Sequence, residues 1–567
     1  MRTRRQELAE AKAAHNHPAY SKMSFVMGCG IQGPGRGSHV TDERGRSFLA
    51  LFDQYGNQSF GYAHERIVAA VREQLDSSVL NSTKIMFEEV SIRLAERLSE
   101  LTDGALPYAY FANGGGESID NALKLARAAT GRANIVSAHG CFHGKTFATL
   151  AASGRPEHRA VFGPFPEAFT QVPFGDIEAL AGAVDGGTAA VLLEPVQAEA
   201  GVIVPPPDYL VRVREVCDRA GALLIFDEMQ TAFGRCGTFF AHQRFGVTPD
   251  LLCIGKAFGG GILALSAVLG TAAVWEVLKT LPSSFGSSLG GNPLACRVGL
   301  ESIAVASAPE FLTGVEDAGR VIGETLAAAA ANHPDLIVEH RGIGMMHGLE
   351  LRDESLVGLV LGRLLAEGVT STYSLYNTRV LRVQPPMVIS PDELRHGLDV
   401  LLGVLAEVSD HRGATGPAAT AAGSPLVREV QLPGVRPKEA LEALWAAPRL
   451  LDPFAAHPDA KAAAASGRHT DPDFAGMLGE DRVVWADETE IRPDGVLLRA
   501  EPCWLWDRLQ RSAVVRPLAD ETGSVVEIRV DWDTGSGAYE DMVAGRIGFL
   551  AARRLSELIA HAEEQWA

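Results

Sequence analysis

Apolar residues follow two alternating spacings through residues 1–408. DYLVRVREVCDRA (208–220) has helical spacing and precedes Gly221, a residue type that often ends helices. ALLIF (222–226) is then a continuous apolar run, as in a strand covered on both faces. A similar strand, PYAYFA (107–112), precedes the helical SIDNALKLARAA (118–129). This pattern predicts an α/β fold whose mostly parallel sheet has flanking helices.

The pattern changes after residue 408. SDHRGATGPAATAAGS (409–424) has no apolar periodicity and is predicted to be a linker. Beyond it, RPDG (492–495) indicates a turn, and SVVEIRVDW (524–532) alternates as a half-buried antiparallel strand does. The chain then ends in a predicted amphipathic helix with its apolar stripe at Ile547, Leu550, Ala551, Leu555, Leu558 and Ile559. Residues 425–567 therefore form a second, α+β unit.

Composition narrows the class of protein. The 567 residues are 46% hydrophobic and 21% charged, which is globular, and the net charge of −19 disfavours wholesale binding to nucleic acid or anionic membranes. No apolar run is long enough to span a bilayer, and the N-terminus lacks the apolar core of a secretory signal. The seven cysteines are scattered without a C-x-x-C pair, so we expect neither a metal site nor disulfides, and a cytoplasmic location.

Parallel sheets bind ligands at the carboxyl ends of their strands, and two candidate sites follow predicted strands of the first half. Asn113-Gly114-Gly115-Gly116 lies between a strand and a helix, where free N–H groups can hold a phosphate. The alternative there is a simple tight turn. Asp227 follows LLIF and could hold a cation or a protonated ring nitrogen. Its alternatives are a helix cap or a Mg²⁺ ligand.

Two more candidates lie further along the chain. Lys256 ends another strand before a glycine-rich run, where a lysine of lowered pKa could form a Schiff base with an aldehyde. An ordinary surface lysine is the alternative. SSFGSSLGGNPLAC (283–296) sets hydroxyls beside glycines, which suits phosphate oxygens or a flexible loop. Together the four candidates are the parts that a pyridoxal phosphate (PLP) site requires.

Two glycine-rich segments could suggest a nucleotide instead. GCFHGKT (140–146) has one spacer residue too few for a P-loop. GCGIQG (28–33) fits a dinucleotide motif but lacks a clear preceding strand, and Pro34 follows it in place of a helix. We therefore disfavour both interpretations.

Four motifs in order, EPVQAEAGVIVPPPDYL (194–210), FDEMQTAFGRCG (226–237), GKAFGGG (255–261) and GGNPLAC (290–296), resemble the class III (ω-amino-acid type) aminotransferases of PLP fold type I. Within that family, the motifs most resemble those of ornithine and acetylornithine aminotransferases. The resemblance covers about residues 25–408. It implies an N-terminal arm with part of a small domain (1–70), a large PLP-binding domain (71–310) and the rest of the small domain (311–408), before the linker (409–424) and the accessory unit (425–567).

The resemblance also implies the cofactor site. Lys256 would carry the cofactor and shuttle the substrate proton, and Asp227 would pair with the ring nitrogen. Phe142 would stack on the ring, with His143 beside it. Gln230 would contact the phenolic oxygen of the cofactor, and the N–H groups of Gly115 and Gly116 would hold its phosphate. Ser288 would reach the phosphate of the cofactor in a partner subunit, which implies a homodimer with shared active sites.

For substrate, the resemblance points to four positions. Glu199 and Arg382 match a pair that switches: the arginine binds the carboxylate of a keto acid or glutamate, and pairs with the glutamate when a terminal amine occupies the site. Tyr55 matches a substrate-side tyrosine, with core packing as the alternative. Lys145 stands where relatives often have an arginine that helps bind carboxylate, and lysine lacks the bidentate fork. For Arg382 the alternative is a surface ion pair.

The expected activity is ping-pong transfer of an amino group between an amine or ω-amino acid and a keto acid or aldehyde. The order of elements in residues 425–567 resembles the helix-grip fold of START and polyketide-cyclase-like domains, which suggests a specialised carbonyl substrate: a natural product, a peptide or a carrier-bound intermediate. A dimer-stabilising appendage is the alternative role for that unit. Other PLP chemistry (racemase, aminomutase or decarboxylase) and a non-catalytic binding or scaffold protein stay open as alternative functions.

Overall fold

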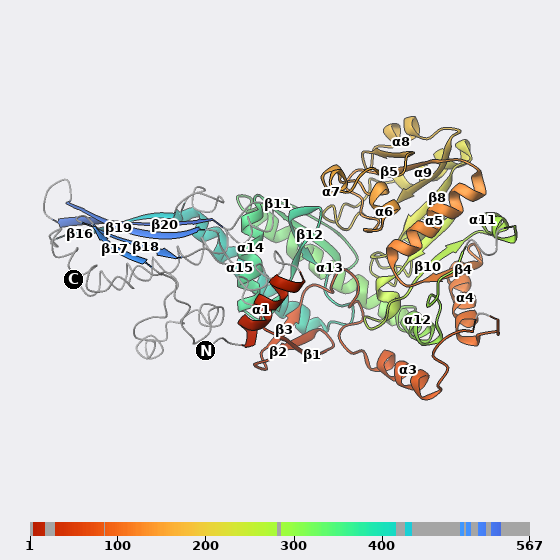
Figure 1. Ribbon diagram of the computed structural model, residues 1–567, viewed down its shortest axis with the longest axis horizontal. Coiled ribbons are helices and arrows are strands. Elements are labelled where there is room, and N and C mark those ends of the chain that lie inside the picture. The colour runs from red at the N-terminus through yellow and green to blue at the C-terminus, as the bar shows by residue number, and fades with distance from the viewer. Residues whose placement is uncertain are drawn as a thin grey trace.

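The computed structural model describes residues 4–16, 29–83, 85–280 and 285–415, together with five strands between residues 426 and 533. Figure 1 shows the chain from its N-terminal helix in red to the last described strand in blue. The individual candidate site residues of the sequence analysis, from Tyr55 to Arg382, all lie within the described ranges up to residue 415.

A seven-stranded sheet forms the centre of the first part. Its order is β4-β10-β9-β8-β7-β5-β6, and only β10 runs antiparallel to its two neighbours. The predicted mostly parallel sheet is thus confirmed. The strands are β4 (Tyr108–Ala112), β5 (Asn134–Ala138), β6 (Phe169–Val172), β7 (Thr188–Leu193), β8 (Leu223–Asp227), β9 (Leu251–Ile254) and β10 (Ser266–Gly270).

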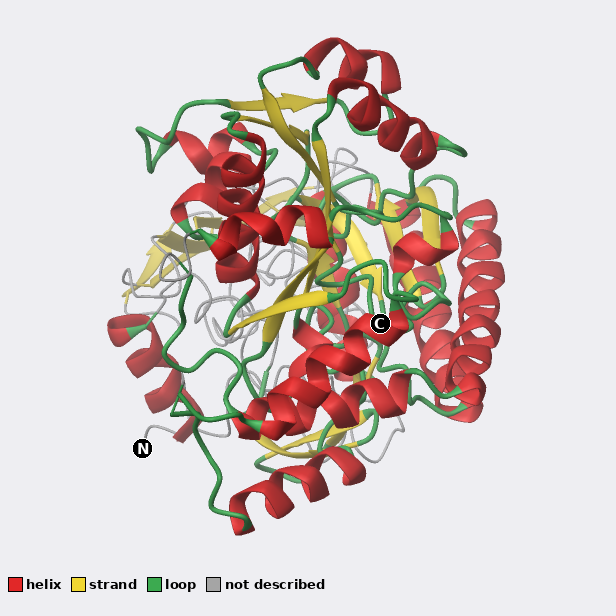
Figure 2. Ribbon diagram, turned by 90° about the vertical axis from the view of Figure 1, so that its right-hand side faces the viewer, coloured by secondary structure: helices red, strands yellow, loops and turns green. Residues whose placement is uncertain are grey.

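Helices pack against this sheet, as Figure 2 shows in red against yellow strands. Every residue of β7 is buried, which explains its unbroken apolar sequence. The helix α9 (Tyr209–Ala220) ends where Gly221 adopts a left-handed φ of 63°. The helix α5 (Gly115–Thr130) ends in the same way at Gly131, with φ 67°. Both strand–helix predictions around these elements are confirmed.

Two smaller sheets are built from distant segments of the chain. In the first, β1 (Gln32–Arg36), β2 (His39–Asp42) and β3 (Ser47–Ala50) are joined by β13 (Val369–Thr370), which pairs in parallel with β3. The second has the order β11-β12-β15-β14 and is antiparallel throughout. Its strands are β11 (Ile337–Ile343), β12 (Met346–Leu351), β14 (Thr372–Ser374) and β15 (Asn377–Val383).

The longest helices, α13 (Pro309–Asn332) and α15 (Pro391–Thr415), belong to the part with the smaller sheets. None of the described helices combines the length and the apolar character needed to cross a membrane. The other helices are α1 (Arg4–His15), α3 (Glu65–Asp76), α4 (Glu89–Leu101), α6 (Phe147–Ala152), α7 (Pro156–Ala160), α8 (Ile177–Ala183), α10 (Ala241–Arg244), α11 (Ala272–Trp275), α12 (Pro293–Ala306) and α14 (Glu354–Ala366), with short 3-10 helices η1 (Lys256–Gly259) and η2 (Glu276–Lys279).

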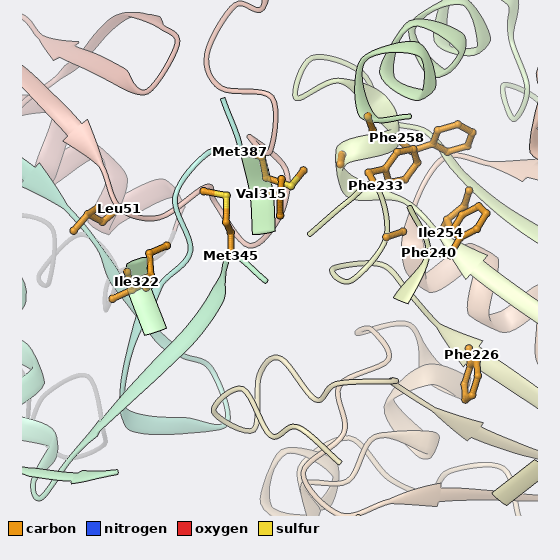
Figure 3. Packing of buried hydrophobic residues seen from close by; sticks show 14 of the residues in the cluster. Leu51, Phe226, Phe233, Phe240, Ile254, Phe258, Val315, Ile322, Met345 and Met387 are labelled. Atoms are coloured by element: carbon orange, nitrogen blue, oxygen red, sulfur yellow. The ribbon is translucent and has the colours of Figure 1, made fainter. Parts of the chain in front are cut away.

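One continuous apolar core connects the large sheet with the smaller ones. It contains Phe226 and Phe258 near the large sheet, and Leu51 and Ile322 in the other part. Figure 3 shows members of both groups, with Met345 on the side of the smaller sheets. Since burial is shared, the two parts hold a defined relative position around the strand ends.

The described strands beyond residue 415 form an antiparallel sheet of order β16-β20-β19-β18-β17. The predicted strand 524–532 lies in β20, and the predicted turn RPDG lies where Arg492 pairs with Gly495. The final amphipathic helix falls outside the described residues, so the helix-grip interpretation stays a prediction. The strands are β16 (Leu426–Pro433), β17 (Glu488–Arg492), β18 (Gly495–Ala500), β19 (Arg508–Pro517) and β20 (Gly523–Asp533).

The start of the predicted linker needs a correction. Helix α15 continues to Thr415, so the first residues of the segment 409–424 are helical. The sequence SDHRGAT contains no proline, and backbone hydrogen bonding can therefore continue through it without an apolar stripe.

Two glycines of α13 offer a matched stability test. A methyl group on Gly319 would lie 2.2 Å from the carbonyl oxygen of Gly344, whereas one on Gly314 would meet nothing within 4 Å. We expect Gly319→Ala to lower the free energy of unfolding by about 1–3 kcal/mol through overpacking. Gly314→Ala should raise it by about 0.5–1 kcal/mol, because alanine favours the helix. Denaturant melts of both variants measure this, and equal effects would contradict the packing described.

Candidate active site

Asp227 and Lys256 lie side by side at the carboxyl edge of the large sheet. Asp227 is the last residue of β8 and pairs in register with Cys253 of the parallel strand β9. Lys256 follows β9 after Gly255 and begins η1 with a φ of 51°. A lysine in this left-handed region is unusual and is held there by the surrounding structure. The sheet thus brings the two predicted catalytic residues together.

The amine of Lys256 is in an environment that favours its neutral form. Burial lowers the pKa of Lys256 from its ordinary value of 10.5, although the carboxylates of Glu199, Asp227 and Glu194 oppose the shift. A neutral amine is the nucleophilic form that condenses with an aldehyde. The structure therefore provides the reactive lysine that the sequence predicted at this strand end.

Asp227 is held by a buried histidine. Its Oδ2 lies 2.9 Å from Nδ1 of His143, and its Oδ1 accepts the N–H of Met229 at 3.1 Å. Burial would lower the pKa of His143, but interactions with Cys141 and Asp227 raise it well above 6.5. The sequence placed His143 beside the cofactor ring, but its bond to a residue 84 positions away could not be read from the chain.

Sequence reasoning missed a third carboxyl group, Glu194. It directly follows β7, and its side chain accepts the N–H of Phe142 at 2.9 Å and that of Ala198 at 3.0 Å. Burial raises the pKa of Glu194 to about 7, with the charge of His143 opposing and that of Asp227 adding. An acid directly after an apolar strand was the signal used for Asp227, and it would have identified Glu194 too.

The start of α5 provides the phosphate-binding geometry. Gly115 and Gly116 are its first two residues, whose N–H groups have no partners within the helix. A methyl group on Gly115 would lie 3.1 Å from Sδ of Met229, and one on Gly116 would lie 3.0 Å from Cγ2 of Thr146. The backbone here therefore approaches the loops that carry the other site residues, which glycine permits.

The second predicted phosphate-binding segment contains two neighbouring serines, Ser287 and Ser288, that lie in different environments. Ser287 accepts a hydrogen bond from the side chain of Asn113 at 3.0 Å, directly beside the start of α5. Ser288 is exposed. Ser287 therefore lies beside the candidate phosphate site of its own chain, and the role of Ser288 toward a second subunit stays a prediction.

The predicted switch pair is present and fully buried. Oε1 of Glu199 lies 3.5 Å from Nη1 of Arg382 and accepts the side-chain amide of Gln230 at 2.6 Å. Gln230 in turn accepts a hydrogen bond from Nη2 of Arg382 at 3.2 Å. Arg382 has 0% exposed surface, so the alternative of a surface ion pair is wrong. The three side chains form one closed set of contacts.

This set continues into the N-terminal segment. Arg382 also donates to Gln384, whose amide donates to Oδ1 of Asp53 at 2.9 Å. Oδ2 of Asp53 pairs with Arg235 at 2.6 Å, and both side chains have no exposed surface. Residues from the N-terminal segment, the large-sheet loops and β15 are thereby joined beneath the site. No pattern in the sequence pointed to Asp53, Arg235 or Gln384.

The remaining predicted substrate residues lie at the edge of this arrangement. Gly56 adopts a φ of 90°, and a methyl group there would lie 3.4 Å from Cδ of Lys256, so the backbone directly after Tyr55 passes close to the lysine. Tyr55 is half-buried and makes an edge contact with Phe52. Lys145 is exposed in the loop between β5 and α6. The roles of Tyr55 and Lys145 toward a substrate are taken up below.

The donor set fits PLP. Backbone N–H groups at the start of α5 suit a phosphate, a carboxylate ends β8 where a ring nitrogen can be paired, and a lysine of lowered pKa follows β9. Among the residues that the structure describes, no group of three or more His, Cys, Asp or Glu side chains could hold a metal ion. The arrangement supports chemistry on an amine through a covalently held aldehyde cofactor.

Known proteins resemble this chain in sequence and in fold. The chain is 36% identical over 375 residues to a putrescine aminotransferase from Pectobacterium atrosepticum, covering 64% of this chain and 80% of that protein. The structure resembles ornithine aminotransferase from Toxoplasma gondii with a TM-score of 0.64 and 29% identity, over 68% of this chain and 92% of that one. It also resembles an amine transaminase from an uncultivated Pseudomonas species in its PLP-bound form, with a TM-score of 0.62 and 25% identity over 67% and 95%.

The family match agrees with the geometry of the site. Residues 30–405 match the family described as aminotransferase class-III, and this range contains every site residue named above. The cofactor is accordingly pyridoxal phosphate. The chain belongs to the class-III aminotransferase family and is a PLP-dependent aminotransferase.

Proposed function

We propose that this aminotransferase moves an amino group from the terminal carbon of an amine or ω-amino acid to a keto acid or aldehyde, in two half-reactions. The observation that carries the proposal is the buried pair of Glu199 and Arg382. The pair provides a neutralised wall for an uncharged or cationic substrate end. Opening it would free a guanidinium for the carboxylate of a keto acid.

Lys256 and the residues around it have separate roles in the proposed reaction. PLP, when bound, supplies an aldehyde that condenses with amines and a ring that accepts an electron pair when a proton leaves the substrate carbon. The amine of Lys256 takes that proton and returns it at the neighbouring position. Asp227, fixed by His143, balances the positive charge of the ring nitrogen. Phe142 covers the ring and keeps water away from it.

Other contacts position the cofactor. The N–H groups of Gly115 and Gly116 hold the phosphate, and Gln230 reaches the phenolic oxygen while it stays bonded to Glu199. Gln230 therefore links the state of the cofactor with the state of the switch pair. Tyr55 would contact the substrate, and the support for this role is that the adjoining Gly56 lies close to the side chain of Lys256.

Racemase, aminomutase or decarboxylase chemistry would use the same lysine and aspartate, but it has no need for a carboxylate receptor that opens and closes. A binding or scaffold role would not require a lysine of lowered pKa beside a paired aspartate. We also propose a specialised carbonyl substrate, because the chain continues well beyond the family match at residues 30–405. A product assay with carrier-bound and free ketones would test that part of the proposal.

The first experiment records the visible absorption spectrum of the holoenzyme. We expect the cofactor band to shift when an amine is added and to return with a keto acid. Lys256→Ala should remove the band of lysine-bound cofactor and lower the rate by about 10⁴-fold or more, because it loses both the covalent attachment and the proton carrier. Lys279→Ala, at an exposed lysine paired with Glu276, is the control and should behave as wild type. If no amine shifts the cofactor absorption band of the wild-type enzyme, the proposal is wrong.

The second experiment tests the switch pair. Glu199→Gln leaves Arg382 buried without a full counter-charge. We expect kcat/KM for a terminal amine to fall about tenfold to a hundredfold, and that for glutamate to change by less than about threefold. Glu339→Gln, at an exposed carboxylate, is the matched control. Parallel losses for both substrates would refute the switch, because a general structural defect would affect the two alike.

We also propose that the enzyme is a homodimer in which Ser288 reaches the phosphate of the second subunit's cofactor. Ser288 is exposed, and the loop before α4 presents Ile85, Met86 and Phe87 with 89%, 71% and 99% of their surface exposed. Adjacent apolar side chains at such exposure are typical of a surface that a second copy covers.

Light scattering should give a mass of twice 60.3 kDa for the full chain. Phe87→Glu should weaken the dimer and reduce cofactor retention, because a charge in the covered face costs desolvation. Val338→Glu, at another exposed apolar residue, is the control. A monomer with full cofactor content would overturn the proposal.

A further inference from the structure

Basic side chains gather beside the residue that covers the cofactor ring. Lys145, Arg155 and His158, here named the basic cluster, all lie within sixteen positions of Phe142 in the chain. They belong to a protein whose net charge is −19, so their concentration is not the general character of the surface.

Backbone hydrogen bonds fix Arg155 next to the Phe142 loop. The N–H of Gly140 donates to the carbonyl of Gly154 at 3.0 Å, and the N–H of Gly154 donates to the carbonyl of Cys141 at 3.0 Å. A methyl group on Gly154 would lie 2.1 Å from the carbonyl oxygen of Ala138, so the two segments are in close backbone contact. Arg155, the next residue, is therefore held in place against the loop.

Tyr376 connects the basic cluster with the switch pair. Its ring makes edge contacts with Phe142 at 5.5 Å and with His158 at 4.9 Å between centroids. The guanidinium of Arg155 lies over the same ring at 5.7 Å. The backbone N–H of Tyr376 donates to the carbonyl of Glu199 at 2.9 Å. The cluster therefore borders the substrate side of the site.

The charges around the cluster leave it positive. The carboxylate of Glu157 pairs with Nε of Arg155 at 3.5 Å, and 71% of that glutamate side chain is exposed to water, which weakens the pair. Burial, and then the positive charges of Arg155 and Lys145, lower the pKa of His158. Because Glu157 contacts Arg155 through Nε, the two outer nitrogens of this guanidinium could form a bidentate contact with an anion.

We propose that the basic cluster binds an anionic group, a carboxylate or a phosphate, at the end of the amine substrate away from the reacting carbon. Arg155 supplies the guanidinium fork that Lys145 lacks. Like charge would make a diamine a poor substrate of this chain. The inference rests on the proposed transfer from a terminal amine, and it names the class of that amine.

The test compares three amines in the half-reaction of the holoenzyme: 4-aminobutyrate, 2-aminoethyl phosphate and putrescine. We expect wild type to prefer one or both anionic amines over putrescine by at least tenfold in kcat/KM, and the preferred one identifies carboxylate or phosphate as the natural group. Arg155→Met should lower kcat/KM for the anionic amines about tenfold, mainly through KM, as loss of one charge-assisted contact does. Arg155→Lys should restore part of that loss.

Charge reversal separates recognition from folding. Arg155→Glu should raise kcat/KM for putrescine while lowering it for the anionic amines, whereas a folding defect would lower all three together. Arg320→Met, at an exposed arginine of α13, is the control. If all three amines react and their ratio is the same in wild type and the Arg155 variants, the inference is wrong and the proposed function stands. If no amine changes the cofactor band, the proposed function itself fails and the inference with it.

Discussion

Two arginine side chains without exposed surface, Arg235 and Arg382, set the main constraint on this structure. A buried guanidinium must be paired, because an uncompensated charge in the interior costs about 3–5 kcal/mol. Asp53 provides the partner for Arg235, and Glu199 with Gln230 that for Arg382. The N-terminal segment, the loops of the large sheet and β15 must therefore assemble together, and the active site forms where they meet.

The same constraint places three acidic groups around one lysine. Asp227, Glu194 and Glu199 all oppose the lowering of the Lys256 pKa that burial causes. Each of them is held by hydrogen bonds: Asp227 by His143, Glu194 by backbone N–H groups, and Glu199 by the network just described. Burial thus favours the neutral, nucleophilic form of the Lys256 amine, and the three neighbouring carboxylates partly oppose this shift of its pKa.

Acidic and basic side chains occupy different parts of this site. Acids and their buried partners lie at the strand ends, and the basic cluster with Arg155 lies beside the loop that contains Phe142. Tyr376 touches both layers, through its ring and through its backbone N–H. If the proposal above holds, a substrate that enters amine first would meet acidic side chains at its reacting end and basic ones at its far end.

The sequence by itself determined the features that depend on local spacing. Strand-then-helix periodicity predicted the mostly parallel sheet, and residue types at strand ends identified Lys256 and Asp227. Only the tertiary structure decided that His143 bonds to Asp227, that Asp53 neutralises Arg235 and that Arg155 lies by Tyr376. Those contacts join residues between 84 and 221 positions apart, and their pairing follows from which loops meet at the sheet edge. Burial, which sets the pKa of Lys256 and the need for each ion pair, likewise exists only once the separate segments have packed together.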